Sequence, residues 1–183
     1  MADVPENADN TLTPMMRNMI GILWDEWKTI EQQIDELTDR LEQIAASDPG
    51  CCRIRQIPGI GPIVATAIVA AIGNGAAFSK GRDFAAWLGL VPRQYSTGGK
   101  AKLLGISKRG NTYLRKVLIH GARAAAMRIK RDRFPIGAWM NALEARAPRN
   151  VLVVAMANKL ARIAWAVLSS GEDYRPAVSI AAA

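Results

Sequence analysis

The N-terminal quarter of the chain carries a regular series of apolar positions. They lie alternately three and four residues apart, at Ile20, Leu23, Trp27, Ile30, Ile34, Leu37, Leu41 and Ile44. This spacing is the a/d seam of a heptad repeat. It predicts a long coiled-coil helix over residues 15–47, preceded by a disordered tail at residues 1–14. The sequence Ser47-Asp48-Pro49-Gly50 then predicts the end of that helix.

The heptad pattern leaves two interpretations open. The helix could lay its apolar face on its own domain, or it could pair with another helix or another chain as a coiled coil. Asp35, Glu36, Asp39 and Glu42 flank the seam. A coiled-coil partner with basic flanks would therefore suit it.

The remainder of the chain shows further helical patterns and no strand-period segment of useful length. A Pro58-Gly59-Ile60-Gly61-Pro62 turn separates two of them within residues 54–72. Others cover residues 78–88, with Ser79 as a possible cap, and 111–131, with Asn111 as the cap. The last two cover 135–145 and 151–170, the final one stopped by Gly171. Residues 90–106 are glycine-rich and basic, which indicates a loop or a short hairpin.

These patterns predict an all-α fold. We expect a long N-terminal heptad helix followed by a compact helical domain at residues 51–175. That domain would contain a helix-hairpin-helix-like motif at residues 54–72, and residues 176–183 would form a tail.

Charge divides the chain at about the same place. Residues 1–50 carry three basic and eleven acidic side chains, a net charge of −8, whereas residues 51–183 carry a net charge of +16. A unit so strongly positive favours a polyanionic partner. A membrane is disfavoured, because the apolar run Val151–Leu168 is interrupted by Asn158, Lys159 and Arg162. The acidic N-terminus does not resemble a signal peptide, so we expect a cytoplasmic protein.

The side chains that usually carry metal or thiol chemistry are few. Cys51 and Cys52 are adjacent, which disfavours a disulfide between them, and the chain has a single histidine, His120. We therefore expect no zinc site and no cofactor in this chain. His120 is interpreted as a core or surface residue rather than a catalytic base.

The Pro58–Gly61 turn resembles a helix-hairpin-helix DNA-binding motif. Glycines at Gly59 and Gly61 would let a phosphate approach the backbone closely. The N–H groups that open the following helix would then face the anion, with the helix dipole behind them. The alternative is a plain turn between two helices, which also needs glycine.

The segment from residue 88 to residue 111 places a hydroxyl pair, Ser96 and Thr97, in a glycine-containing turn among cations. Cations can hold a phosphodiester and stabilise the charge that develops on it. A serine in that setting could act as a nucleophile, although no general base is evident nearby. The alternative is a solvated basic loop.

A larger basic surface is expected to continue along the following helices. Its members include Arg115, Lys116, Arg123, Arg128, Lys130, Arg131 and Arg133. Asn158, Lys159 and Arg162 could reach the same site or could mark the solvent face of the last helix. The residues that we expect to bind DNA are Gly59, Gly61, Arg93, Lys100, Lys102, Lys108, Arg109, Asn111 and Arg115.

Three segments of this sequence together resemble a known family. They are IPGIGPIVATAIVAAIG, FAAWLGLVPRQYSTGGKAKLLGISKRGNTYLRKVLIHGARAA and VVAMANKLARIAWAVLSSGEDY. They resemble the C-terminal domain of insertion-sequence transposases of the 110/116/902 family, over about residues 15–175. Members are DNA recombinases that excise and insert their element, and an element-encoded guide RNA is implicated in their choice of target. Complete members have an N-terminal acidic domain that binds divalent metal.

The resemblance implies a serine nucleophile within Tyr95-Ser96-Thr97-Gly98-Gly99. Many relatives have Ser-Ser-Gly or Gln-Ser-Gly at this place, whereas this chain has Ser-Thr-Gly. We assign the nucleophile to Ser96, with Thr97 as the alternative. The acidic residues among positions 1–50 belong to the heptad helix, so the divalent metal is expected only with an N-terminal domain that this chain lacks.

Two hypotheses follow for the function. In the first, the chain is the C-terminal part of a transposase that binds DNA and supplies the serine nucleophile, and it is not an autonomous enzyme. In the second, it is a non-enzymatic module that binds nucleic acid and dimerises. The expected partners are DNA, a guide RNA, and a second copy or a full-length transposase bound through the coiled coil.

Overall fold

The computed structural model describes residues 11–97, 100–131 and 135–176. In chain order the elements are α1 (Pro14–Ser47), α2 (Pro49–Arg55), α3 (Pro62–Ile72), α4 (Gly81–Trp87), β1 (Pro92–Thr97), β2 (Lys100–Ile106), α5 (Thr112–Arg128), α6 (Pro135–Glu144) and α7 (Arg149–Ser170). The chain divides into two compact units, residues 1–42 and 43–183. The predicted helical class is confirmed, with one small sheet added.

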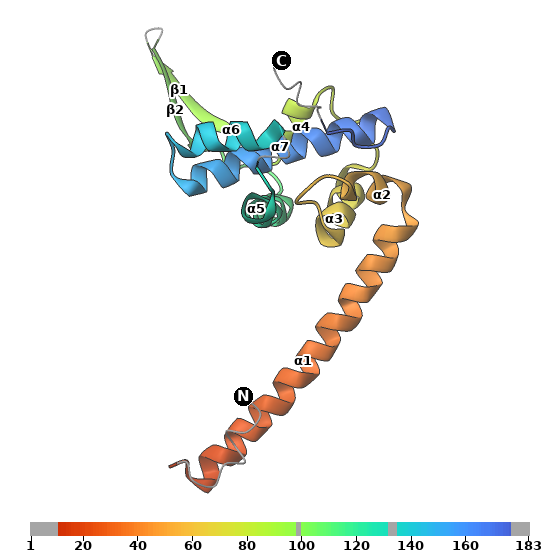
Figure 1. Ribbon diagram of the computed structural model, residues 1–183, viewed down its shortest axis with the longest axis vertical. Helices are drawn as coiled ribbons and strands as arrows, with labels where there is room; N and C mark the ends of the chain where they lie inside the picture. Colours follow the sequence, from red (N-terminus) through yellow and green to blue (C-terminus); the bar gives the residue numbers. More distant parts are fainter. Residues whose placement is uncertain (1–10, 98–99, 132–134, 177–183) are drawn as a thin grey trace. The chain divides into compact units, whose positions relative to one another are not determined.

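Helix α1 is a single uninterrupted helix in Figure 1. Pro14 stands at its start, where a missing N–H costs nothing because the first turn has no partner for it. The helix ends at Ser47, and the side chain of Asp48 then caps α2 by accepting a hydrogen bond from the Cys51 backbone N–H at 2.7 Å. The predicted limits of the heptad helix are therefore confirmed to within a residue.

The apolar seam of α1 lies exposed. Within residues 14–42, Ile34 keeps 55% and Leu37 58% of its surface open to solvent, and Ile20 and Leu41 are half-buried. The one buried residue of α1 is Ala45, which belongs to the second unit. Within the described residues of the first unit, no other element covers the seam.

The core of the second unit is built around α7. This helix packs against α2, α4, α5 and α6, and α3 packs against α2 and α5. Alanines such as Ala122 on α5 and Ala157 on α7 are fully buried, which lets the two helix backbones approach closely. Larger side chains fill the remaining space, and those that are fully buried include Ile54, Phe84, Leu118, Met156 and Leu160.

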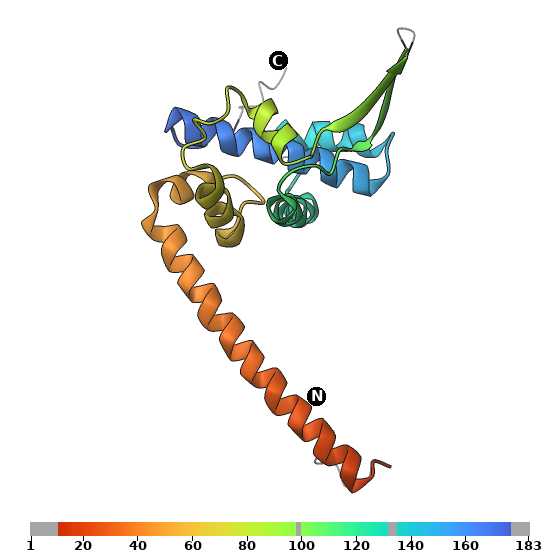
Figure 2. The ribbon, with the colours of Figure 1, turned by 180° about the vertical axis from the view of Figure 1, so that it is seen from behind.

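The two strands form an antiparallel hairpin within residues 90–106, for which a loop or short hairpin was expected. The register pairs Tyr95 with Lys102 and Ser96 with Ala101, with an irregularity between Pro92 and Gln94. Figures 1 and 2 show the hairpin projecting clear of the helices from opposite viewpoints. The two strands have six and seven residues, and neither alternates strictly between apolar and polar residues, so the sequence shows no strand period there.

One predicted helix start is wrong. The pattern placed a helix over residues 78–88 with Ser79 as its cap, but α4 begins at Gly81 and its N-cap is Lys80, with no side-chain hydrogen bond. Phe78 instead packs on the ring of Phe84, with 5.4 Å between ring centroids. Its apolar character therefore reflects a tertiary contact rather than a helix face.

Helix α7 is long and apolar enough to cross a membrane by length and composition alone. Half of its most apolar window is buried inside the protein, as in the central helix of a folded core. Gly171 ends it in the left-handed conformation at φ 70°, as the sequence predicted.

Candidate nucleic-acid interface

The Pro58–Gly61 turn joins α2 to α3, and its first glycine is needed for packing. Gly59 has φ 95°, and a Cβ placed there would lie 2.8 Å from the Cβ of Ala125 and 3.0 Å from the carbonyl oxygen of Gly121. A Cβ on Gly121 would in turn lie 2.2 Å from the oxygen of Gly59. The backbones of the turn and of α5 therefore cross at a distance that only glycine permits.

Gly61 differs from Gly59, because a Cβ added to it would meet nothing within 4 Å. It is exposed and forms the N-cap of α3 without any side-chain hydrogen bond. Pro62 has no N–H, so the first N–H groups of α3 are those of Ile63 and Val64. The turn therefore presents one glycine to the protein and one to solvent, and an anion would approach at Gly61.

The Lys108–Asn111 segment is held against the end of α4. A Cβ on Gly110 would lie 1.7 Å from the carbonyl oxygen of Trp87, and the N–H of Lys108 donates to the oxygen of Gly89 at 3.1 Å. Lys108 has φ 57°, an uncommon conformation for a residue with a side chain. The close backbone crossing imposes it, and it leaves the side chains of Lys108 and Arg109 exposed.

Two predicted DNA-binding residues of this region also serve the fold. The side chain of Asn111 caps α5 by accepting a hydrogen bond from the Leu114 N–H at 3.0 Å, as predicted. The guanidinium of Arg115 donates to the carbonyl oxygens of Leu88 at 3.0 Å and Arg109 at 3.3 Å. Arg115 therefore fastens the segment to the end of α4, and part of its hydrogen-bonding capacity is already used.

Ser96 lies exposed on β1. The side-chain amide of Gln94, two residues earlier on the same strand, donates to its Oγ atom at 2.7 Å. Side chains alternate along a strand, so both point to the same face of the hairpin. Among the described residues, Gln94 is the hydroxyl's hydrogen-bond partner, and no carboxylate or imidazole is bonded to it. The sequence missed this contact, although a polar residue at position i−2 of a strand was a usable signal.

The hairpin carries four further predicted site residues, Arg93, Thr97, Lys100 and Lys102. Arg93 and Lys102 are exposed, and Lys102 stands opposite Tyr95 in the register. Thr97 pairs with Lys100 through the backbone. The side chains of Thr97 and Lys100 lie outside the described residues, so the choice between Ser96 and Thr97 stays a prediction.

Asn158, Lys159 and Arg162 line one groove beside the root of the hairpin. The amide of Asn158 donates to the carbonyl oxygen of Leu90 at 3.1 Å, which ties α7 to the start of the hairpin. The ammonium of Lys159 lies 4.7 Å from the centroid of the Trp139 ring. The stripe on α7 therefore reaches the region of the hairpin rather than being only a solvent face.

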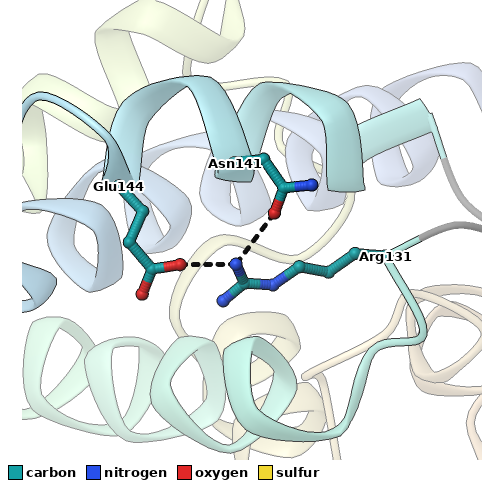
Figure 3. A network of polar contacts seen from close by, with 3 residues as sticks. All are labelled: Arg131, Asn141 and Glu144. Carbon is teal, nitrogen blue, oxygen red and sulfur yellow. Dashed lines mark hydrogen bonds and ion pairs between the residues drawn. The ribbon is translucent and has the colours of Figure 1, made fainter.

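Arg131, which the sequence counted as part of the basic surface, is neutralised within the fold. It forms an ion pair with Glu144 and donates to Asn141 at 2.9 Å (Figure 3). The hydrogen bond from Arg131 holds the pKa of Glu144 below its ordinary value. Within the described parts of residues 43–176 no other lysine or arginine forms an ion pair. Most lysines and arginines in the described part of the unit therefore have no carboxylate partner and could face an external anion.

Other chemistries receive little support from the side chains. Burial, and then the nearby carboxylate of Asp48, raise the pKa of the Cys51 thiol to about 11, so it stays protonated at neutral pH. His120 is exposed. In the ranges 11–97, 100–131 and 135–176, no three His, Cys, Asp or Glu residues are grouped so as to hold a metal ion.

Known transposases are similar to this chain in sequence. The sequence model of the Transposase IS116/IS110/IS902 family matches residues 51–135. Residues 51–135 are therefore similar in sequence to this transposase family. The matched range contains the glycine turn, the hairpin with Ser96 and the whole Lys108–Asn111 segment.

Curated transposases are similar over most of the chain. A "Probable family 20 transposase" of Pseudomonas aeruginosa is 47% identical over 88% of this chain and 48% of its own length. The "Transposase for insertion sequence element IS1111A" of Coxiella burnetii is 41% identical over 90% of this chain and 45% of its own. The corresponding transposase for IS1328 of Yersinia enterocolitica is 40% identical, over 95% and 52%. The chain thus spans about half the length of these relatives.

Proposed function

We propose that this chain is the C-terminal, DNA-handling part of a transposase of the IS116/IS110/IS902 family. It binds the sugar–phosphate backbone and supplies Ser96 as the nucleophile for strand exchange. The observation that carries the proposal is an exposed serine hydroxyl on a hairpin of a unit in whose described part Arg131 is the one cation with an ion pair. Similarity to transposases over most of the chain supports the reaction class.

The proposed step is a transesterification at phosphorus. A bond forms between Ser96 Oγ and the phosphorus, and the bond from that phosphorus to one strand oxygen breaks. Ser96 loses its proton, and the leaving strand oxygen takes up a proton. Gln94 holds the hydroxyl in place, and exposed cations such as Arg93 and Lys102 neutralise the phosphate as charge develops. The described residues do not fit the divalent metal that the family resemblance implies, so no step is assigned to a metal in this chain.

Backbone binding is proposed to use the open side of the glycine turn and the exposed cations. Gly61 with the first N–H groups of α3, together with Lys108 and Arg109, would contact phosphates and carry no sequence information. An RNA strand offers the same phosphates, so a guide RNA remains a proposed partner. A nucleic-acid partner is consistent with a cytoplasmic location.

The covalent intermediate provides the test. This chain is mixed with a separately produced segment of the IS1111A transposase that covers the part it does not match, and with a labelled DNA substrate. A protein–DNA adduct that survives denaturation and maps to Ser96 is expected. Ser96→Ala should abolish it and leave DNA affinity within about twofold, since a single neutral hydroxyl contributes little to backbone binding. An adduct that persists in Ser96→Ala and disappears in Thr97→Ala would transfer the role to Thr97.

A second candidate function is a non-enzymatic module that binds nucleic acid and pairs with another chain. The exposed heptad seam of α1 favours it. The relevant partner is a second copy, or the same seam of a full-length transposase. Salt-dependent DNA binding without any adduct, even with the complementary segment present, would support this candidate over the first. Salt-independent binding would contradict both, because each relies on displacing counterions from phosphates.

A further inference from the structure

A groove of about 1320 Å³ lies in the second unit, beside the root of the hairpin. Three parts of the chain form it: the start of α4, the base of the hairpin and one side of α7, with Trp139 of α6 at its edge. Pockets for small ligands usually measure about 300–1,000 Å³. This groove therefore has room for more than a single small molecule.

Many residues that line the groove are apolar, and we call this set its floor. Its members include Leu104 and Ile106 from β2 and Val151, Val154 and Ile163 from α7. Leu104 keeps 41% and Val151 49% of its surface exposed. Apolar surface of this kind, open to water beside polar residues, marks a binding surface more often than a random patch does.

The rim of the groove is positive. Among the described residues that line the groove, four are cationic, namely Lys80, Arg82, Lys159 and Arg162, which we call its rim, and none is an aspartate or glutamate. None of the four forms an ion pair in the described structure. Lys159 lies over the Trp139 ring, which keeps its ammonium at the edge of the apolar floor. An occupant must therefore combine negative charge with apolar, flat surface.

We propose that the groove binds a short unpaired stretch of a nucleic-acid strand, with its bases on the apolar floor and its phosphates against the cationic rim. This inference rests on the proposed function, because the root of the hairpin that carries Ser96 forms one side of the groove. A duplex does not meet the requirement, since its bases are stacked and paired and cannot reach the floor. An unpaired strand does, because bases pack on aromatic and aliphatic side chains while the backbone tracks a positive groove.

The groove would bind a single-stranded segment of the substrate during strand exchange. Strand exchange requires that bases leave one duplex before they pair in another. A site that binds unpaired bases at the root of the hairpin that carries Ser96 would stabilise that state. The apolar floor supplies selectivity for unpaired strand, and the rim supplies affinity.

The test compares strands with equal charge. The intact chain is titrated with an oligothymidylate of about 12 nucleotides, with an abasic strand of the same length, and with a duplex. The expected result is that the abasic strand binds roughly tenfold or more weakly than the oligothymidylate, although both carry the same phosphates. Equal affinity for the two strands would overturn the proposal, because the bases would then contribute nothing.

Two groove variants locate the effect. Val151→Gln places an amide on the exposed part of the floor and should remove most of the difference between the two strands. Arg162→Gln should weaken both strands and reduce their salt dependence, whereas the matched control Arg55→Gln, on α2 and outside the groove, should leave strand discrimination unchanged. Discrimination that survives in Val151→Gln would place the bases elsewhere and refute the assignment.

An acidic amphipathic helix of another protein could also satisfy an apolar floor with a positive rim. If a peptide of that kind competes for the chain, and the groove variants weaken the peptide but not the oligothymidylate, the groove is a protein-docking site and the proposal is wrong. The result for strand binding in the groove is independent of the result for the Ser96 nucleophile. Strand binding needs no chemistry, so Ser96→Ala should keep full discrimination even if no covalent adduct is ever found.

Discussion

Helices α1 and α7 are the two longest in the chain, and they differ in how many of their apolar residues are buried. In α7, nine residues are buried, among them Leu152, Met156 and Leu160. In α1, which is half as long again, the only buried residue is Ala45. Both sequences repeat apolar residues at helical spacing. The comparison shows that such a pattern specifies a face to be covered but does not identify what covers it.

The difference lies in what accompanies the apolar positions. Helix α7 carries small residues, such as Ala157, Ala161 and Ala164, that allow other helices to approach from several sides. Helix α1 carries a narrow stripe of large residues bordered by carboxylates such as Asp35 and Glu42. The first composition builds a core within one chain, and the second is typical of a seam that pairs with another helix.

The largest expected effect is the difference in stability between two substitutions, each of which shortens one apolar side chain, in α7 and in α1. Leu160→Ala should lower the free energy of unfolding by about 2–5 kcal/mol, because it leaves a cavity beneath the glycine turn. Ile34→Ala, on the exposed seam, should change it by less than about 0.5 kcal/mol in dilute protein. Urea unfolding followed by circular dichroism measures both. Equal losses would mean that the seam of α1 is buried in solution.

The next largest effect is the difference in stability cost between substituting Gly59 and substituting Gly61, the two glycines of the turn that packs on α5. Gly59→Ala should cost about 1–3 kcal/mol, because it combines a positive φ with a contact 2.8 Å from Ala125. Gly61→Ala should cost less, about 0.5–1 kcal/mol, because alanine is a poorer N-cap than glycine, and it should weaken DNA binding if a phosphate approaches there. Unfolding and DNA titration of the same pair give the answer. A stable Gly59→Ala protein would contradict the close crossing with α5.

A charge on the seam tests whether α1 pairs. Ile34→Lys should weaken self-association tenfold or more, since it places an ammonium at the centre of the apolar stripe. Gln32→Lys adds the same charge to the opposite face and should leave association nearly unchanged. Sedimentation at several protein concentrations measures the difference. Identical behaviour of both variants and the unmodified chain would remove the seam as an oligomer interface.

The smallest effect concerns the Arg131–Glu144 pair at the end of α5. The pKa of Glu144 is lowered in the folded chain, so the pair stabilises the fold above the ordinary pKa of 4.5. That contribution is lost as the pH falls through the lowered folded-state pKa. Glu144→Gln should therefore flatten the decrease in melting temperature between about pH 5 and pH 3. Glu172→Gln, at a carboxylate with no described ion pair, should leave the decrease intact.

Much of the fold was determined by the sequence alone. The heptad spacing specified α1, the Asn111 cap and apolar face specified α5, and Gly171 specified the end of α7. Each of these depends on interactions within a few residues along the chain, so each can be deduced from residue spacing. The charge division between residues 1–50 and 51–183 was equally evident, because charge is a property of composition.

Tertiary structure decided which residues of the candidate site remain free. It assigned Gly59 to packing, engaged Arg115 and Arg131 within the fold, and left Gly61 and Ser96 open to solvent. It also brought the start of α4, the hairpin base and α7 together into one groove. Each of these features depends on contacts between residues that lie tens of positions apart in the sequence. A local pattern of residue types does not reveal such contacts. Chain crossings and long-range hydrogen bonds determine which cations and glycines are left for a ligand.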